Sequence, residues 1–193
     1  MKQKTEKAEV GVIVARFQVP YLTEPHIDLI NTVLENHPRV IIFLGLSHFI
    51  GTRNNPLDFE TRKQMILEAY PNDKQLSILY IKDINNNDEL WSKKLDEMIS
   101  DMLPPGQNAI LYGGRDSFIN HYSGKYKTIE LEPKSWISGT EIRKSISSRV
   151  KSSPDFRAGV IWATQNKWPT TLATVDAVIF KRNEEKIITH ILL

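Results

Sequence analysis

Two stretches of this chain place side chains that bind anions at the start of a predicted helix. The first, residues 15–26, lies between the apolar run 10–14 and a stretch whose apolar residues have helical spacing. A buried strand that breaks into a loop and continues as a helix directs the free N–H groups of the helix toward the edge of the sheet. Arg16 follows the strand, and His26 falls in the first helical turn. This arrangement predicts an anion site.

Local chemistry supports a helix start at this point. Thr23 is a good N-cap, because its hydroxyl accepts a hydrogen bond from a backbone N–H two or three residues later. Pro25 suits the first turn, since the N–H that it lacks would have had no partner within the helix. A capped helix whose histidine is a simple surface residue would have the same sequence, so this stretch alone leaves both interpretations open.

The second stretch is Ile-Ser-Gly-Thr-Glu-Ile-Arg, residues 137–143. Ser138 and Thr140 offer hydroxyls, the turn offers free N–H groups, and Arg143 lies within reach of the same helix end. Such a group suits a triphosphate. Helix capping alone would explain a serine or threonine here, but not the whole set.

The elements that must position these residues alternate along the chain. Apolar runs rich in β-branched residues predict strands that are covered on both faces, and stretches with helical spacing separate them. The strands are expected at 10–14, 39–46, 76–81, 109–112 and 128–131, with helices at 57–70 and 88–102. This alternation predicts an α/β fold with a parallel sheet, right-handed crossovers and helices on both faces. Ligands of such sheets bind beyond the carboxyl ends of the strands, where the strand order reverses.

The motifs resemble two signatures of the nucleotidylyltransferase superfamily. Thr23-Glu-Pro-His26 is similar to (H/T)xGH, and residues 137–143 are similar to ISxTxxR. The preceding Arg-Phe-Gln-Val-Pro resembles a branch of nicotinamide-mononucleotide adenylyltransferases. The resemblance covers roughly residues 10–168 and implies a Rossmann-like nucleotidylyltransferase fold. The motif glycine is replaced by Pro25, whose ring is expected to crowd a nucleotide.

The resemblance also implies which residues bind ATP. Thr23 and His26 would contact its phosphates, while Ser138, Thr140 and Arg143 would hold the β and γ phosphates. Together with Arg16, the residues Thr23, His26 and Arg143 form the expected catalytic set. The remaining expected ATP contacts are Phe17, Gln18, Gly113, Arg115 and Asp116.

The segment that follows the fourth strand has an interpretation of its own. Gly113 and Gly114 directly after a strand permit positive φ and a close approach of the backbone to a ligand. Asp116 would accept a hydrogen bond from a sugar hydroxyl or cap the short helix that follows.

An acceptor site is expected near the second and third strands. The resemblance gives Arg53 a phosphate contact and places Asn55 beside it, while Arg62 is either a phosphate ligand or a structural partner of a helix carboxylate. Trp91 follows three asparagines, and we expect Asp88 to cap its helix. A tryptophan on a helix is usually a core residue, but its face also suits a pyridinium ring through a cation–π attraction of about 0.5 to 2 kcal/mol.

The implied reaction transfers the adenylyl group of ATP to nicotinamide mononucleotide, giving NAD and pyrophosphate. The Mg²⁺ that accompanies ATP would be bound largely by phosphates and water, without a metal site of the protein's own. Other phosphorylated acceptors, such as nicotinate mononucleotide or a pantetheine phosphate, and a cytidylyl donor would use the same phosphate motifs. A nucleotide sensor without catalysis is a further alternative, which Pro25 favours.

Composition limits the other classes of function. With 25 Lys plus Arg against 23 Asp plus Glu, the net charge of +2 gives no reason to expect a nucleic acid or membrane partner. The chain has no cysteine, which excludes disulfides and thiolate metal sites and fits a cytoplasmic protein. The first apolar run is too short for a signal peptide, and no stretch approaches the roughly 20 apolar residues of a membrane helix.

The length of 193 residues fits one nucleotide-binding domain with an appendage. We expect the nucleotidylyltransferase domain at 1–168 and a C-terminal β-hairpin at 169–193. This hairpin resembles the first hairpin of a Nudix hydrolase domain, although no glutamate-rich Nudix box follows it. A two-stranded hairpin is marginal alone. We therefore expect a chain cut short, or a hairpin that docks on the main domain or on another subunit of a homo-oligomer.

Overall fold

The computed structural model describes most of the chain, and its contacts divide the chain into two compact units. The units are Met1–Ser148 and Arg149–Leu193. The described residues are 10–114, 117–132, 137–148, 154–166, 179–185 and 188–192.

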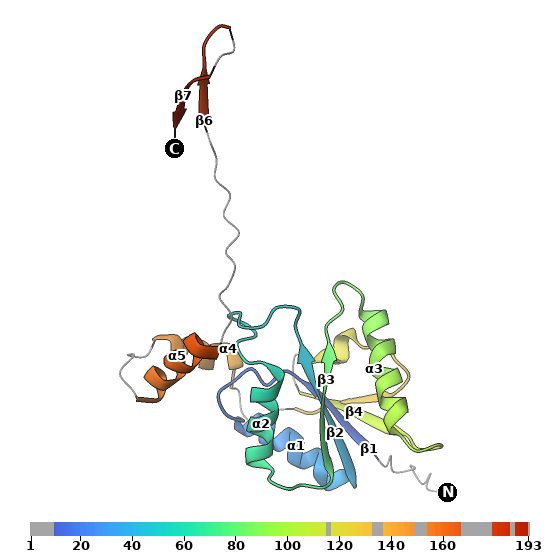
Figure 1. Cartoon of the computed structure of the whole chain (residues 1–193). Helices are drawn as coiled ribbons and strands as arrows, with labels where there is room; N and C mark the ends of the chain where they lie inside the picture. The colour runs from blue at the N-terminus through green and yellow to red at the C-terminus, as the bar shows by residue number, and fades with distance from the viewer. Residues whose placement is uncertain are drawn as a thin grey trace, which may run out of the picture. The chain divides into compact units, whose positions relative to one another are not determined.

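The first unit is built on a five-stranded sheet (Figure 1). Its strands are β1 (Val10–Ala15), β2 (Arg39–Leu46), β3 (Leu76–Lys82), β4 (Ala109–Gly113) and β5 (Lys127–Glu130). All pairings are parallel, and the order is β3-β2-β1-β4-β5. The predicted parallel sheet is confirmed. The strand order reverses between β1 and β4, so the carboxyl ends of these two strands mark the expected ligand site.

Helices cover both faces of this sheet. The helices are α1 (Glu24–Asn36), α2 (Phe59–Ala69), α3 (Asp88–Met102), the 3₁₀ helix η1 (Phe118–His121) and α4 (Gly139–Ser148). Figure 1 shows α1 and α2 on one face and α3 on the other. This is the three-layer arrangement that the alternating strands and helices predict.

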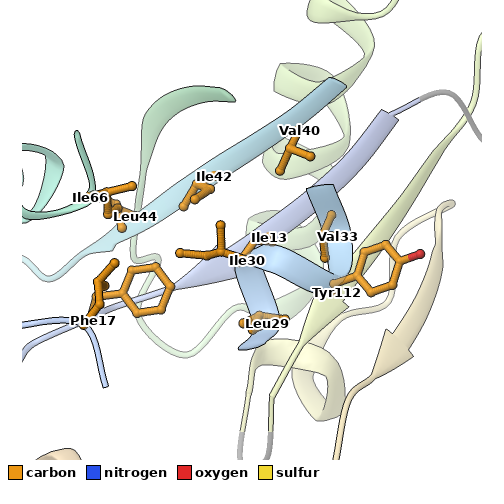
Figure 2. Close-up of a cluster of buried hydrophobic side chains, with 11 residues drawn as sticks. Ile13, Phe17, Leu29, Ile30, Val33, Val40, Ile42, Leu44, Ile66 and Tyr112 are labelled. Atoms are coloured by element: carbon orange, nitrogen blue, oxygen red, sulfur yellow. The ribbon is translucent and has the colours of Figure 1, made fainter. Parts of the chain in front are cut away.

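Alternate residues of the strands supply two separate cores. In β2, Ile42 and Leu44 pack with Ile30 of α1 and Ile66 of α2 (Figure 2). The intervening residues Ile41 and Phe43 face the other way and pack with Leu95 of α3. Because successive side chains of a strand point to opposite faces, a strand buried on both sides has a continuous apolar sequence, as β2 does.

Side-chain caps set where two of these helices begin. Asp58 caps α2 by accepting a hydrogen bond from the Thr61 N–H at 2.8 Å, and this backbone donor holds the pKa of Asp58 below its usual value. Asn87 caps α3 by accepting from Leu90 N–H at 2.8 Å. The prediction of Asp88 as this cap is therefore wrong by one residue. Asp88 lies at the first helical position instead, where its charge also suits the helix dipole.

The second unit contains α5 (Pro154–Asn166) and the strands β6 (Ile179–Arg182) and β7 (Ile188–Leu192). The two strands pair antiparallel, as predicted for a hairpin. The expected domain boundary, between 168 and 169, lies outside the described residues and stays a prediction. Among the described helices, none has the length and apolar character needed to cross a membrane.

Candidate functional site

A pocket of about 800 Å³ opens at the carboxyl ends of the strands. Residues that end or follow each of the five strands line it. They include Arg16 after β1, Gly45 of β2, Asp83 after β3, Gly114 after β4 and Glu132 after β5. Helix residues complete the wall, among them Pro25 and His26 of α1 and Trp91 of α3. The pocket therefore lies where a parallel sheet binds its ligands.

His26 is held at the start of α1 by the residue that caps this helix. Thr23 is the N-cap, as predicted, and its backbone N–H donates a hydrogen bond to Nδ1 of His26 at 3.2 Å. The Thr23 hydroxyl lies 3.0 Å from the same nitrogen. A backbone N–H is always a donor, so Nδ1 accepts and the proton of the neutral ring belongs on Nε2. His26 thus has an Nε2–H donor for the pocket that it lines.

Burial keeps this imidazole neutral. Desolvation lowers the pKa of His26 from 6.5 to about 4. One neighbour that removes water is Phe17, whose ring meets the His26 ring edge-on with centroids 4.8 Å apart. Phe17 is buried and has a φ of +43°, a region that few residues other than glycine adopt. Strained backbone of this kind persists only where the surroundings hold it in place.

Two arginines and a glutamine hold the backbone on both sides of Phe17. Arg62 donates from Nη1 to the Arg16 carbonyl at 2.7 Å and to the Gly45 carbonyl at 3.0 Å. Gln18 hydrogen-bonds the backbone of Leu57 in both directions, at 2.9 and 3.0 Å. On the far side, Arg143 donates from Nη1 to the Gln18 carbonyl at 3.0 Å. The loop after β1 is therefore fixed by side chains from two other parts of the chain.

These contacts define the roles of two residues from the sequence analysis. The Arg62 side chain is only 1% exposed and also donates from Nε to the Asp58 carbonyl at 3.0 Å, so it is structural. Its partners are backbone carbonyls, not the helix carboxylate that we considered. Desolvation lowers the pKa of Arg62, although its guanidinium stays charged. The Gln18 amide is buried against Leu57, and its expected contact with ATP stays a prediction.

The second motif lies against the loop that leads to the first. Ser138 accepts from Glu141 N–H at 3.4 Å at the start of α4, and Thr140 accepts from Nη2 of Arg143 at 3.1 Å. Arg143 then joins this helix start to Gln18. Ile137, the first residue of the motif, lines the same pocket as His26. The two motifs are thus adjacent in space, although their roles toward phosphate stay predictions.

Arg16 reaches across the pocket wall to the ends of two other strands. Its Nη2 donates to both carboxylate oxygens of Asp83, at 2.9 and 2.8 Å, and its Nη1 donates to Oδ1 of Asn55 at 3.2 Å. The side chain passes over Gly45, where an added Cβ would lie 3.5 Å from Cγ of Arg16. Asn55, expected at the acceptor, therefore contacts an expected catalytic residue instead of lining the pocket.

The glycines after β4 differ from expectation. Neither Gly113 nor Gly114 has a positive φ. A Cβ at Gly113 would lie 2.3 Å from Oγ of Ser117, so this glycine is needed because the chain folds back on itself there. Gly114 has open space at the same position and lines the pocket. Arg115 and Asp116 lie outside the described residues.

The acceptor residues are divided between the pocket and its surroundings. Trp91 lines the pocket, packs against the core beneath α3 and has its ring centroid 6.0 Å from that of Phe118. Arg53 lies in the exposed loop after β2 and is not among the residues that line the pocket. Sequence reasoning missed Asp83, Glu132 and His121, which also line it. Asp83 and Glu132 could have been predicted from the sequence, because each follows a strand of a parallel sheet, where ligands bind.

Comparison with known proteins supports the fold. No protein family profile and no curated protein sequence matches the chain. Among solved structures, a bifunctional NMN adenylyltransferase/ADP ribose pyrophosphatase from Francisella tularensis matches with a TM-score of 0.65 and 21% identity, over 82% of this chain and 51% of that one. The same protein with AMP and a manganese ion matches equally, over 50% of its chain. The NadR protein in complex with NAD and AMP-PNP matches at 0.54 and 15%, over 74% of this chain and 43% of that one.

This chain shares the α/β, Rossmann-like fold of these proteins. It spans about half the length of the Francisella protein. The described residues form a five-stranded parallel sheet with its helices. This fold agrees with the Rossmann-like fold that the two sequence motifs imply. At these identities the shared property is the fold, so the reaction has to be argued from the pocket itself.

Proposed function

We propose that this protein transfers the adenylyl group of ATP to nicotinamide mononucleotide, giving NAD and pyrophosphate. The observation that carries the proposal is the pocket, because an arginine and a histidine that suit phosphate line it together with an aromatic ring. Arg16 and His26 lie toward the centre of the sheet, and Trp91 lies on α3. A volume of about 800 Å³ is within the range for bound ligands of this size.

The reaction needs alignment and charge stabilisation more than it needs a nucleophilic residue. An oxygen of the acceptor's 5′-phosphate attacks the α-phosphorus of ATP, a new P–O bond forms, and the bond to the β-phosphate bridge breaks. The phosphate monoester is already a competent nucleophile, and pyrophosphate leaves with the bridging oxygen. The protein holds two polyanions in line and stabilises the charge that develops.

Each phosphate-binding residue has a distinct part in this scheme. His26 donates from Nε2–H as a neutral group, so it binds an oxygen of the phosphate chain without taking part in proton transfer. Arg16 adds a positive charge at the end of β1. Arg143 supplies further N–H donors at the start of α4, beyond the one that Gln18 receives.

Magnesium enters this scheme with ATP. The described residues contain no group of three or more histidine, aspartate or glutamate side chains arranged to hold a metal ion. The ion would be held by the phosphates and water, as Mg²⁺ often is at nucleotide sites. It would neutralise part of the charge on the phosphates.

The acceptor would stack its base on Trp91. The ring is half-buried at the pocket wall, next to the ring of Phe118, which also lines the pocket. A positively charged pyridinium is attracted to the face of an indole ring by a cation–π interaction. The adenine of ATP is uncharged and would not gain this attraction. Trp91 is therefore our candidate for choosing between acceptors that share a phosphate.

The test is pyrophosphate release from ATP and Mg²⁺ with a panel of acceptors. We expect release with nicotinamide mononucleotide, and less with nicotinate mononucleotide or a pantetheine phosphate. Replacing Trp91 with alanine should raise KM for the acceptor about 10-fold and leave KM for ATP nearly unchanged. Phe49→Ala is the control, because this aromatic residue of the same unit is exposed and is not among the residues that line the pocket, so it should affect neither constant. Pyrophosphate release with another acceptor, and none with nicotinamide mononucleotide, would show that the proposed acceptor is wrong.

A nucleotide sensor without catalysis is the second candidate, and one observation favours it. Pro25 has no N–H, and the N–H groups of His26 and Ile27 both donate to the Thr23 carbonyl, at 2.9 and 3.0 Å. The first turn of α1 thus offers a phosphate fewer donors than a glycine in place of Pro25 would allow. ATP binding measured by calorimetry, without pyrophosphate release from any acceptor, would support the sensor and overturn the transferase.

A further inference from the structure

Asp83 lies directly after β3 and lines the pocket, and its carboxylate forms an ion pair with Arg16 at 2.8 Å. We propose that Asp83 is a positioning residue that holds the Arg16 guanidinium at the phosphates of the bound nucleotide. This inference rests on the proposed function, because it gives Arg16 a phosphate to bind. It adds a residue that no motif contains.

Hydrogen bonds from two directions fix the orientation of the Arg16 guanidinium. Both oxygens of Asp83 accept from Nη2, and Asn55 accepts from Nη1, so side chains after β3 and after β2 fix the plane of the guanidinium. Asp83 is itself fixed, since its backbone N–H donates to the Leu46 carbonyl at 2.8 Å. The stem of Arg16 passes over Gly45, where even an added Cβ would be at ordinary van der Waals distance from it.

An arginine that is left free would be a poor phosphate ligand. Its side chain has about 2 kcal/mol of rotamer entropy to lose, and 49% of the Arg16 side chain is exposed. Bonds that fix the guanidinium before the ligand arrives reduce this cost. The three bonds to Asp83 and Asn55 use at most three of its five N–H donors, so donors remain for a phosphate.

Asp83 also has an opposing effect, which makes the proposal testable. Its negative charge lies at the wall of a pocket that we expect to bind a polyanion, so it repels the ground state of ATP. Removing the charge should tighten ATP binding, while loss of the fixed guanidinium should slow the reaction. A residue that served only to stabilise the fold would not separate KM from kcat in this way.

The experiment compares Asp83→Asn with Glu132→Gln in the full chain. Both residues line the pocket, so each variant removes one negative charge from its wall. Glu132 follows β5, at the opposite edge of the sheet from β3, whereas Asp83 follows β3. We expect KM for ATP to fall about 2-fold in both. We expect kcat to fall about 10- to 100-fold in Asp83→Asn only. Equal kcat values in the two variants would overturn the proposal.

Two further measurements keep this result separate from the proposed function. In ¹⁵N relaxation of the arginine Nε–H groups, Arg16 should be ordered in the wild type and mobile in Asp83→Asn, whether or not the protein turns over. Pyrophosphate release by Arg16→Met, Asp83→Asn and the double variant should show that the effect of Asp83 on kcat disappears without Arg16. An Arg16 that stays ordered without Asp83, or additive effects on kcat, would contradict the proposal. An Arg16 that is ordered in the wild type and mobile in Asp83→Asn, in a protein that releases no pyrophosphate, would contradict only the transferase function.

Discussion

The guanidinium of Arg143 donates a hydrogen bond to the carbonyl oxygen of Gln18, a residue 125 positions earlier in the chain, at 3.0 Å. This bond joins the start of α4 to the loop between β1 and α1. Gln18 follows Phe17, whose ring packs on His26. The contact therefore connects the second phosphate motif to the residue that we expect to donate from the first.

Arg143→Lys tests this connection, because lysine keeps the charge but lacks the planar fork that reaches Gln18 and Thr140 together. We expect the free energy of unfolding to fall by about 1 to 2 kcal/mol, as for loss of a hydrogen bond from a charged donor. KM for ATP should rise. Lys144→Arg is the control at the neighbouring, exposed position. An unchanged free energy of unfolding in urea denaturation would show that the contact between Arg143 and Gln18 does not stabilise the fold.

The pH dependence of stability tests the burial of His26. Its pKa is about 4 in the folded protein against 6.5 as the ordinary value, so between these pH values the unfolded chain binds more protons. Stability from this group is complete above pH 6.5 and is lost as the pH falls toward 4, by at most about 3 kcal/mol. Urea denaturation of wild type and His26→Gln between pH 7 and 4 should show a flatter profile for the variant.

Arg62→Met tests whether the buried guanidinium holds the ends of β1 and β2. The variant would leave the buried carbonyl partners of Arg62 without their charged donor, at a cost of roughly 2 to 4 kcal/mol in unfolding free energy. Gln64→Met, on an exposed position of the same helix, should change stability by less than about 0.5 kcal/mol. A methionine at 62 that left stability unchanged would show that the carbonyls find other partners.

Substitutions at Pro25 separate two physical effects, the missing N–H donor and the crowding by the ring. Pro25→Ala restores a backbone N–H but keeps a Cβ, whereas Pro25→Gly restores the N–H and also removes the bulk. If the missing donor weakens ATP binding, both variants should tighten it about equally. If crowding weakens it, only glycine should do so. Calorimetric titration with ATP distinguishes these outcomes, and no change in either variant would remove Pro25 as an argument for a sensor.

The fold was largely predictable, because a strand that is buried on both faces has a continuous run of apolar residues. The apolar run of β2 extends over residues 40–44, all of which are buried, and the other strands alternate with helices in the same way. Element boundaries were less secure. Asn87 and Asp88 are both good capping residues, so composition cannot decide which of two neighbours ends the loop.

The site was predictable only where a motif is local. Thr23 and His26 lie three residues apart, and their contact follows from the helix start. Asp83 and Arg16 are separated by 67 positions, and their pairing depends on which strand ends meet at one edge of the sheet. Gly113 does not adopt the positive φ that a glycine permits, and the space beside its Cα is taken by Ser117, while its expected contact with ATP stays a prediction.

The place of β1 in the sheet has a consequence for synthesis on the ribosome. β1 pairs with β2 on one side and with β4 on the other, with Val10 opposite both Arg39 and Ala109. A nascent chain that has emerged only as far as β3 can join three strands, but one edge of its most apolar strand has no neighbour yet. That edge therefore stays open to pairing with other strands until β4 has been synthesised.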